Sequence, residues 1–157
     1  MELLEEADGE PGAFKNLEQY GQIVDRIMGA AKSIQMQFPD DVTETHALHF
    51  IGDCAAICKA VGYKTSQVSD NHQLFNVCVA FLLDSTEVLE KLVNSLEGKA
   101  DKYKEVVFNK TFLERLRWIN SQFKDDVRAT VASNGGVTPA RLKQAEIDDL
   151  LKKLGVG

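Results

Sequence analysis

Residues 42–61 read VTETHALHFIGDCAAICKAV, and the rest of the chain can be arranged around them. Their apolar side chains recur at helical spacing, and one face carries Leu48, Ile51, Ala55 and Cys58. A second set extends this face around the helix: Phe50, Cys54, Ile57 and Val61. A helix that is apolar over so wide an arc is buried on several sides. The pattern predicts a central helix that follows the capping-box sequence of residues 41–44 and stops at Gly62.

Three further segments show the same helical period. Residues 14–37 form a predicted helix whose apolar face continues to Ile34 and Phe38, and Pro39 ends it. Ser69 is the expected N-cap of a long helix that runs to Gly98. Thr111 opens a capping box before a helix that runs to about residue 132.

No segment alternates apolar and polar residues between paired turn signals, so we expect no sheet. The predicted fold class is all-α: an antiparallel four-helix bundle over residues 14–132, with a short additional amphipathic helix at the C-terminus. Residues 1–13 are expected to be a polar N-terminal lead, and residues 133–138 a linker that contains Gly135 and Gly136.

Composition narrows the class of protein. The chain has 157 residues, of which 44% are hydrophobic and 27% charged, as in ordinary globular domains. Its 18 basic and 24 acidic residues give a net charge of −6, which argues against a general nucleic-acid or anionic-membrane binder. The acidic start lacks a signal-peptide core, and no window is apolar for long enough to span a bilayer. With three cysteines in apolar helical patterns, we expect reduced thiols and a cytoplasmic protein.

The last segment, residues 139–157, is the predicted partner-binding helix. Thr138 and Pro139 suit its start, and Gly155 suits its end. Its apolar residues fall on one stripe, and acidic residues flank that stripe: Ile147, Leu150, Leu151 and Leu154, with Glu146, Asp148 and Asp149. So short a helix needs a surface to fold against. That surface is either the chain's own bundle or a groove on another protein.

Residues 143–151, which read KQAEIDDLL, resemble the segment at the start of the flagellar switch protein FliM. They are also similar to the acidic, leucine-rich tail of the phosphatase CheZ. In both families this segment binds the receiver domain of the response regulator CheY. The resemblance implies that the apolar stripe inserts into a receiver-domain groove, while the three acidic residues pair with lysines of the receiver.

Residues 24–34 resemble the signature helix of histidine phosphotransfer (HPt) domains, which are four-helix bundles. Gly29, the two alanines after it and Ile34 match the family pattern, but Asp25 stands where the phosphoryl-accepting histidine belongs, and Met28 where the lysine belongs. A carboxylate repels an incoming phosphate, whereas phosphotransfer needs an imidazole nucleophile and a neighbouring cation. The resemblance therefore implies a degenerate bundle without the reaction, in which Asp25, Gly29 and Lys32 form a secondary contact face.

Other chemistry is weakly signalled. His46, His49 and Asp53 share one helix face, and His72 could add a ligand, but no spacing fixes a closed site, so we predict no metal and no cofactor. CheZ-type phosphatases place an acid and an amide one helical turn apart. Glu18 and Gln22 come closest to that pattern, with Glu in place of Asp.

The sequence thus predicts a non-catalytic protein of bacterial two-component or chemotaxis signalling, whose partner is the receiver domain of a CheY-like response regulator. Two alternatives stay open. One is a CheZ-like receiver phosphatase that uses Glu18 and Gln22. The other is a structural helical dimerisation module, in which the last helix packs on its own bundle and the chain forms a homodimer.

Overall fold

A computed structural model describes residues 1–10, 13–39, 47–96, 108–123 and 152. These residues include five helices: α1 (Glu2–Glu5), α2 (Phe14–Gln37), α3 (Ala47–Thr65), α4 (His72–Asn94) and α6 (Lys110–Gln122). No strand occurs among the described residues. The prediction of an all-α fold is confirmed. Over the same residues, no helix has the length and apolarity that crossing a membrane requires.

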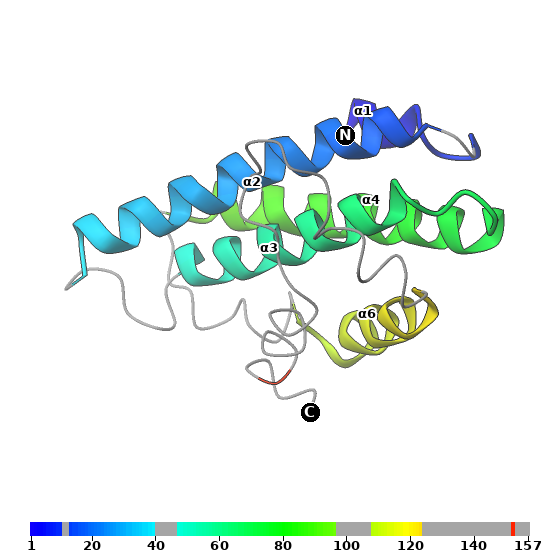
Figure 1. Cartoon of the computed structure of the whole chain (residues 1–157). Coiled ribbons are helices and arrows are strands. Elements are labelled where there is room, and N and C mark those ends of the chain that lie inside the picture. Colours follow the sequence, from blue (N-terminus) through cyan, green and yellow to red (C-terminus); the bar gives the residue numbers. More distant parts are fainter. Residues whose placement is uncertain (11–12, 40–46, 97–107, 124–151, 153–157) are drawn as a thin grey trace.

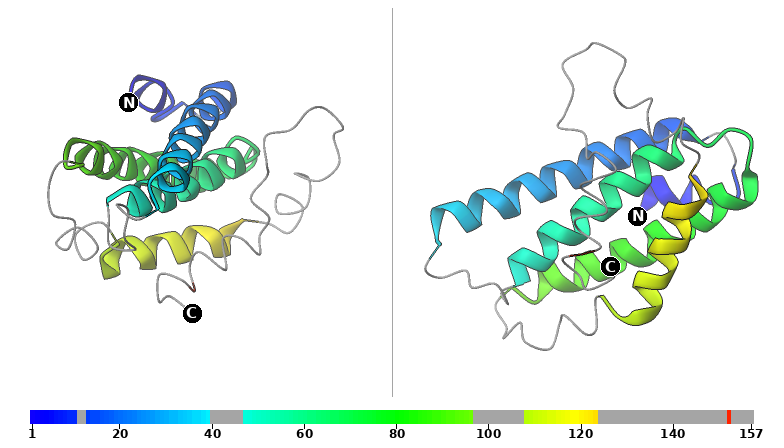
Figure 2. Two further views of the ribbon diagram at one scale, coloured as in Figure 1. Left: turned by 90° about the vertical axis from the view of Figure 1, so that its left-hand side faces the viewer. Right: turned by 60° about the horizontal axis from the view of Figure 1, so that its bottom comes forward.

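The helices pack in three levels (Figures 1 and 2). α1 and α2 lie on one face, α3 and α4 in the middle, and α6 on the opposite face. Because α3 has helices on several sides, 16 of its 19 residues are buried. This is the central helix that the wide apolar arc predicts. It extends past the expected stop at Gly62 and ends at Thr65.

α2 lies against α3 in the opposite direction, because Asp25 meets Lys59 near one end of the contact and Gln35 donates to the Leu48 carbonyl near the other. Small residues bring the two helices together. A Cβ added to Gly21 would lie 3.1 Å from the Tyr63 ring. The prediction of a helix over residues 14–37 is confirmed.

The core face predicted for α2 is wrong at its C-terminal end. Ile34 is 40% exposed and Phe38 is 51% exposed, because the contact of α2 with the core passes through residues such as Val24 and Ala31. Ile34 and Phe38 therefore lie on the flank of the helix, in contact with solvent.

The N-terminal ends of α4 and α6 differ from the expected ones. Asn71, and not Ser69, caps α4 by accepting a hydrogen bond from the Leu74 amide. Asn109 caps α6 by accepting from the Phe112 amide, so Thr111 lies inside the helix. In both cases the capping residue stands three positions before a buried apolar residue, which sets where the helix must begin.

The N-terminal segment is more than a polar lead. Residues 2–5 form α1, and Leu4 and Ala7 are completely buried. Asn16 of α2 donates a hydrogen bond to the Glu6 carboxylate and so holds the segment against the bundle. At the other end, α6 stops at Gln122; residues 124–132, the linker 133–138 and the helix predicted over 139–157 lie outside the described residues, apart from Lys152.

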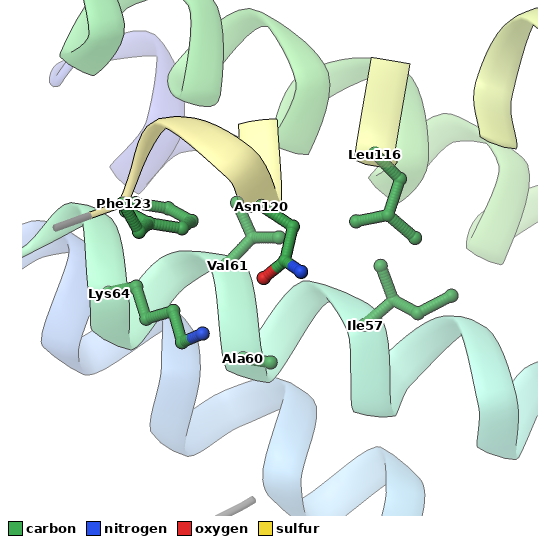
Figure 3. Close-up of a pocket in the computed structure, with 7 residues that line it drawn as sticks. All are labelled: Ile57, Ala60, Val61, Lys64, Leu116, Asn120 and Phe123. Carbon is green, nitrogen blue, oxygen red and sulfur yellow. The ribbon is translucent and has the colours of Figure 1, made fainter. Parts of the chain in front are cut away.

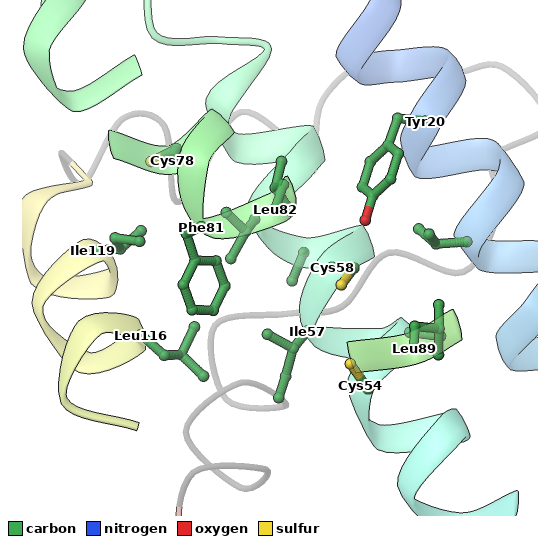
Figure 4. Close-up of a cluster of buried hydrophobic side chains, with 14 of the residues drawn as sticks. Tyr20, Cys54, Ile57, Cys58, Cys78, Phe81, Leu82, Leu89, Leu116 and Ile119 are labelled. Carbon is green, nitrogen blue, oxygen red and sulfur yellow. The ribbon is translucent and has the colours of Figure 1, made fainter. Parts of the chain in front are cut away.

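The core contains a small polar network. Tyr20 of α2 points between α3 and α4 (Figure 4), and its hydroxyl lies 2.8 Å from the Thr86 hydroxyl. Nearby, the Cys54 thiol donates to the carbonyl of Ser85. All three cysteines are free and buried, and burial raises the pKa of Cys78 to about 11. A thiol with that pKa stays protonated and unreactive at neutral pH.

Candidate functional site

The contact between α2 and α3 contains a buried ion pair at the position that the HPt resemblance singles out. Lys59 Nζ of α3 lies 2.5 Å from Asp25 Oδ1 of α2. The lysine side chain is 2% exposed and the aspartate side chain 27% exposed. A lysine so withdrawn from water needs an anionic partner, since an unpaired buried charge is costly. Asp25 is therefore fixed in place by the next helix along the chain.

Other polar groups surround this pair. Glu18 lies two turns before Asp25 on α2 and Gln22 lies one turn before it, and both are exposed. Tyr63 lies one turn after Lys59 on α3 and is half-buried. Burial raises the pKa of Tyr63, and the charges of Asp25 and Glu18 raise it further. The structure thus brings together Glu18, Asp25, Lys59 and Tyr63 along the edge where α2 meets α3.

The secondary contact face predicted on α2 has mixed exposure. Gly29 and Lys32 are exposed, and a Cβ added to Gly29 would have no atom within 4 Å. Met28, at the position where the predicted HPt resemblance expects a lysine, is half-buried and packs on the core. The cation that the motif lacks at residue 28 is thus present as Lys59, but it neutralises Asp25. A neutralised carboxylate within an ion pair has neither the imidazole nucleophile nor the free cation that histidine phosphotransfer uses.

A separate apolar stripe lies on the opposite side of α2 from Asp25, Gly29 and Lys32. Ile23 is 47% exposed and Ile34 is 40% exposed, with Ile27 half-buried between them. These positions are separated by four and seven residues, so they lie on one side of α2.

The histidines do not converge. His49 and Asp53 are half-buried on α3, His72 is exposed at the start of α4, and His46 lies outside the described residues. Within the described ranges, no three His, Cys, Asp or Glu side chains are placed to hold a metal ion. The partner-binding residues predicted in the tail also lie outside those ranges: Glu146, Ile147, Asp148, Asp149, Leu150, Leu151 and Leu154.

Sequence reasoning missed Lys59. The available signal was a lysine in the middle of an apolar helix, which indicates a buried anion on a neighbouring helix. No protein-family model matches the chain, and comparisons with curated proteins and with solved structures find no match.

Proposed function

We propose that this chain is a non-catalytic binding protein for the receiver domain of a CheY-like response regulator, acting in the cytoplasm. The observation that carries the proposal is the Asp25–Lys59 ion pair. Asp25 stands where the HPt resemblance expects the phosphoryl-accepting histidine, and Lys59 neutralises its charge. A bundle that keeps the α2 surface around Asp25 but has no histidine there can still dock a receiver domain. It cannot carry out phosphotransfer.

The arrangement of the helices supports an HPt-like architecture. α2 and α3 run in opposite directions, as do α3 and α4, because Cys54 contacts Ser85 while Thr65 lies near Cys78. Phe50 near Phe108 and Lys64 over Phe123 give α6 the general direction of α3. We interpret α2, α3, α4 and α6 as an antiparallel four-helix bundle.

Two surfaces bind the receiver in this proposal. The tail supplies the acidic, leucine-rich helix that resembles those of FliM and CheZ. The secondary contact face of α2 supplies the second contact through Asp25, Gly29 and Lys32. Gly29 has open space around it, so a partner backbone can approach this face closely.

The test is a titration of the full chain with a purified CheY-like receiver domain, followed by calorimetry, with and without an acyl-phosphate analogue on the receiver. Leu151→Asp places a charge in the apolar stripe and should weaken binding at least tenfold. Ala145→Asp adds the same charge on the opposite side of the predicted helix and should leave the affinity within twofold. Equal affinity for all three proteins would refute the proposal.

A phosphatase remains the rival, and one observation favours it: Glu18 and Gln22 are exposed one turn apart beside Asp25. Release of inorganic phosphate from the phosphorylated receiver is the measurement that separates the two functions. The binding protein leaves the spontaneous rate unchanged. An acceleration that Gln22→Ala abolishes and Gln19→Ala preserves would replace our proposal with the enzyme.

A further inference from the structure

The exposed apolar residues of the bundle are concentrated on one helix. Seven large apolar side chains are exposed among the described residues, and four of them lie between the middle of α2 and its C-cap: Ile23, Ile34, Met36 and Phe38. The C-terminal end of α2 extends past the ends of α3 and α4 (Figures 1 and 2), so those helices do not cover it. Apolar surface gathered in this way marks a site of contact with another molecule.

Four apolar residues form one stripe along α2. Ile23, Ile27, Ile34 and Phe38 lie within about 60° of one another around the helix axis, at about 100° per residue. Ile23 is 47% exposed, Ile34 40% and Phe38 51%, and Ile27 is half-buried. These four residues are the α2 stripe.

The stripe begins where α1 ends its cover of the same side. Asn16 lies seven residues before Ile23, and therefore on the same side of α2, and it donates to the Glu6 carboxylate just after α1. There the added helix buries Leu4 and Ala7 completely. The bundle thus accepts a further helix on this side, and the part of the side beyond Asn16 remains exposed.

A residue of α4 widens the apolar surface. The Thr86 hydroxyl lies 2.8 Å from the Tyr20 hydroxyl of α2, so this side of α4 faces α2. Val93 follows Thr86 by seven residues, which places it on the same side, and it is 45% exposed. Val93 therefore extends the surface of the α2 stripe onto the neighbouring helix.

The spacing of the stripe is self-complementary. Its residues are separated by 4, 7 and 4 positions, so the pattern reads the same in both directions from a centre between Ala30 and Ala31. When two copies of α2 pack antiparallel about a two-fold axis at that centre, Ile23 lies opposite Phe38 of the other copy and Ile27 lies opposite Ile34. Ala30 is exposed at the crossing point, where its small side chain lets the helices approach closely. A two-fold interface requires this symmetry, and a different partner does not.

Charges along α2 do not oppose the pairing. The solvent-side edge of the stripe carries one charged residue, Arg26, among neutral ones such as Ser33 and Gln37. In the antiparallel register the two copies of Arg26 are nine residues apart along the axis, which is about 14 Å. Salt screens charges at the surface over about 8 Å, so the two guanidinium groups repel each other weakly.

We propose that two copies of this chain form a dimer through the α2 stripe, with the two α2 helices antiparallel. The occupant of the stripe is a second copy, and not the tail or a separate protein. The apolar surface is small beside that of obligate dimers, which bury about 2,000 Å² or more, so the dissociation constant is on the order of 10 µM. The secondary contact face lies on the opposite side of α2 and stays free, so this inference does not depend on the proposed function.

Analytical ultracentrifugation of the full chain, from about 1 to about 300 µM, tests the dimer over a range that brackets this constant. Ile34→Glu places a charge within the stripe and should weaken dimerisation at least tenfold. Met36→Glu adds the same charge on the opposite side of α2, at a residue that is 83% exposed, and should change the dissociation constant by less than about twofold. Circular dichroism checks that both variants are folded. A monomer at every concentration, or an equal effect of the two substitutions, overturns the proposal.

Mixtures of charged variants test the antiparallel register. Ile23→Lys and Phe38→Glu should each dimerise poorly alone but form a heterodimer when mixed, because the introduced lysine of one chain faces the introduced glutamate of the other. Ile23→Lys mixed with Ile23→Glu is the control. Its substituted positions are fifteen residues apart along the axis, about 22 Å, so it should stay monomeric. Pairing in the control mixture and not in the first would overturn the register.

The other occupants give different results. In a monomeric chain, nuclear Overhauser contacts between Ile34 and Leu150 or Leu151 would assign the stripe to the tail and overturn the dimer. Loss of receiver binding in a monomeric Ile34→Glu chain whose parent is also monomeric would assign it to the receiver, with the same consequence. A dimer that binds no receiver would leave this inference standing and refute the proposed function.

Discussion

Replacing Asp25 by asparagine tests whether the ion pair holds α2 against α3. The change keeps the shape of the side chain and leaves the ammonium of Lys59, a side chain with 2% exposure, without its carboxylate. Removal of one partner of a buried ion pair costs about 3–5 kcal/mol, whereas an exposed pair contributes about 0–1 kcal/mol. Asp25 is 27% exposed, and Lys59 has a further interaction besides this pair. We therefore expect a loss of about 2–3 kcal/mol in the free energy of unfolding.

The assay is urea unfolding at pH 7, followed by circular dichroism. With a slope of about 2 kcal/mol per molar urea, the midpoint of Asp25→Asn should fall by about 1 M. The double variant Asp25→Asn with Lys59→Met removes both charges and should recover most of the loss, because apolar replacement of a buried pair is often neutral or stabilising. Glu18→Gln, at an exposed carboxylate on the same helix, is the control and should change stability by less than about 0.5 kcal/mol.

Two results would refute this reasoning. A loss below about 1 kcal/mol for Asp25→Asn would place the pair in the range of surface ion pairs. A double variant no more stable than Asp25→Asn would show that the cost does not come from the loss of the Asp25 carboxylate beside Lys59. In either case the ion pair would no longer explain the arrangement of α2 and α3, and the structural basis for a docking surface without a nucleophile would be lost.

Three further predictions concern single substitutions. Gly29→Ala should stabilise the protein by about 0.5–1 kcal/mol, because alanine favours the helix and its Cβ meets open space. Gly21→Ala should stabilise it less, because the added Cβ meets the Tyr63 ring. Thermal unfolding measures both effects. Asn109→Ala should cost about 1 kcal/mol and Thr111→Ala less than half of that in the same assay, which reverses the ranking that the capping box predicts. Because the pKa of Cys78 is raised in the folded protein, its thiol stabilises the fold below pH 9, and that stability is lost as the pH rises from about 9 to 11. Between pH 9 and 11, the free energy of unfolding measured in urea should therefore fall by about 2–3 kcal/mol less for Cys78→Ala than for the unmodified chain. An equal fall in both proteins would contradict the raised pKa of Cys78.

The existence and order of the long helices could be predicted from the sequence, because each carries a periodic apolar face that only packing explains. α3 is the strongest case, since its apolar arc matches its burial on several sides. The helix starts were harder to predict. The run from Ser69 to Asn71 offers several capping residues, and the choice among them depends on which residue reaches the core first, which is Leu74. Nor could local pattern show that the four residues of α1 are anchored, because Leu4 is buried by contacts with helices far along the chain.

The candidate site was only half predictable. Asp25 was identified by its place in a motif, but its partner Lys59 is 34 residues away, and their meeting depends on the relative rotation of two helices. Periodicity gives the face of each helix and not the register between them. For the same reason Ile34 was assigned to the core, whereas the contact of α2 with its neighbours leaves it 40% exposed.

We favour binding over catalysis because Glu18 and Gln22 do not lie in an enclosed space. Catalytic acids and amides act best inside a cleft that excludes water, where fixed dipoles are worth most. Glu18 and Gln22 lie instead on an exposed side of α2, where water weakens their interaction with any charged group. A small buried void between α3 and α6 (Figure 3) is enclosed, but its walls are mainly apolar, and its ionisable residue is Lys64. Among the described residues, the exposed polar face of α2 is therefore better suited to contact with a partner than to catalysis.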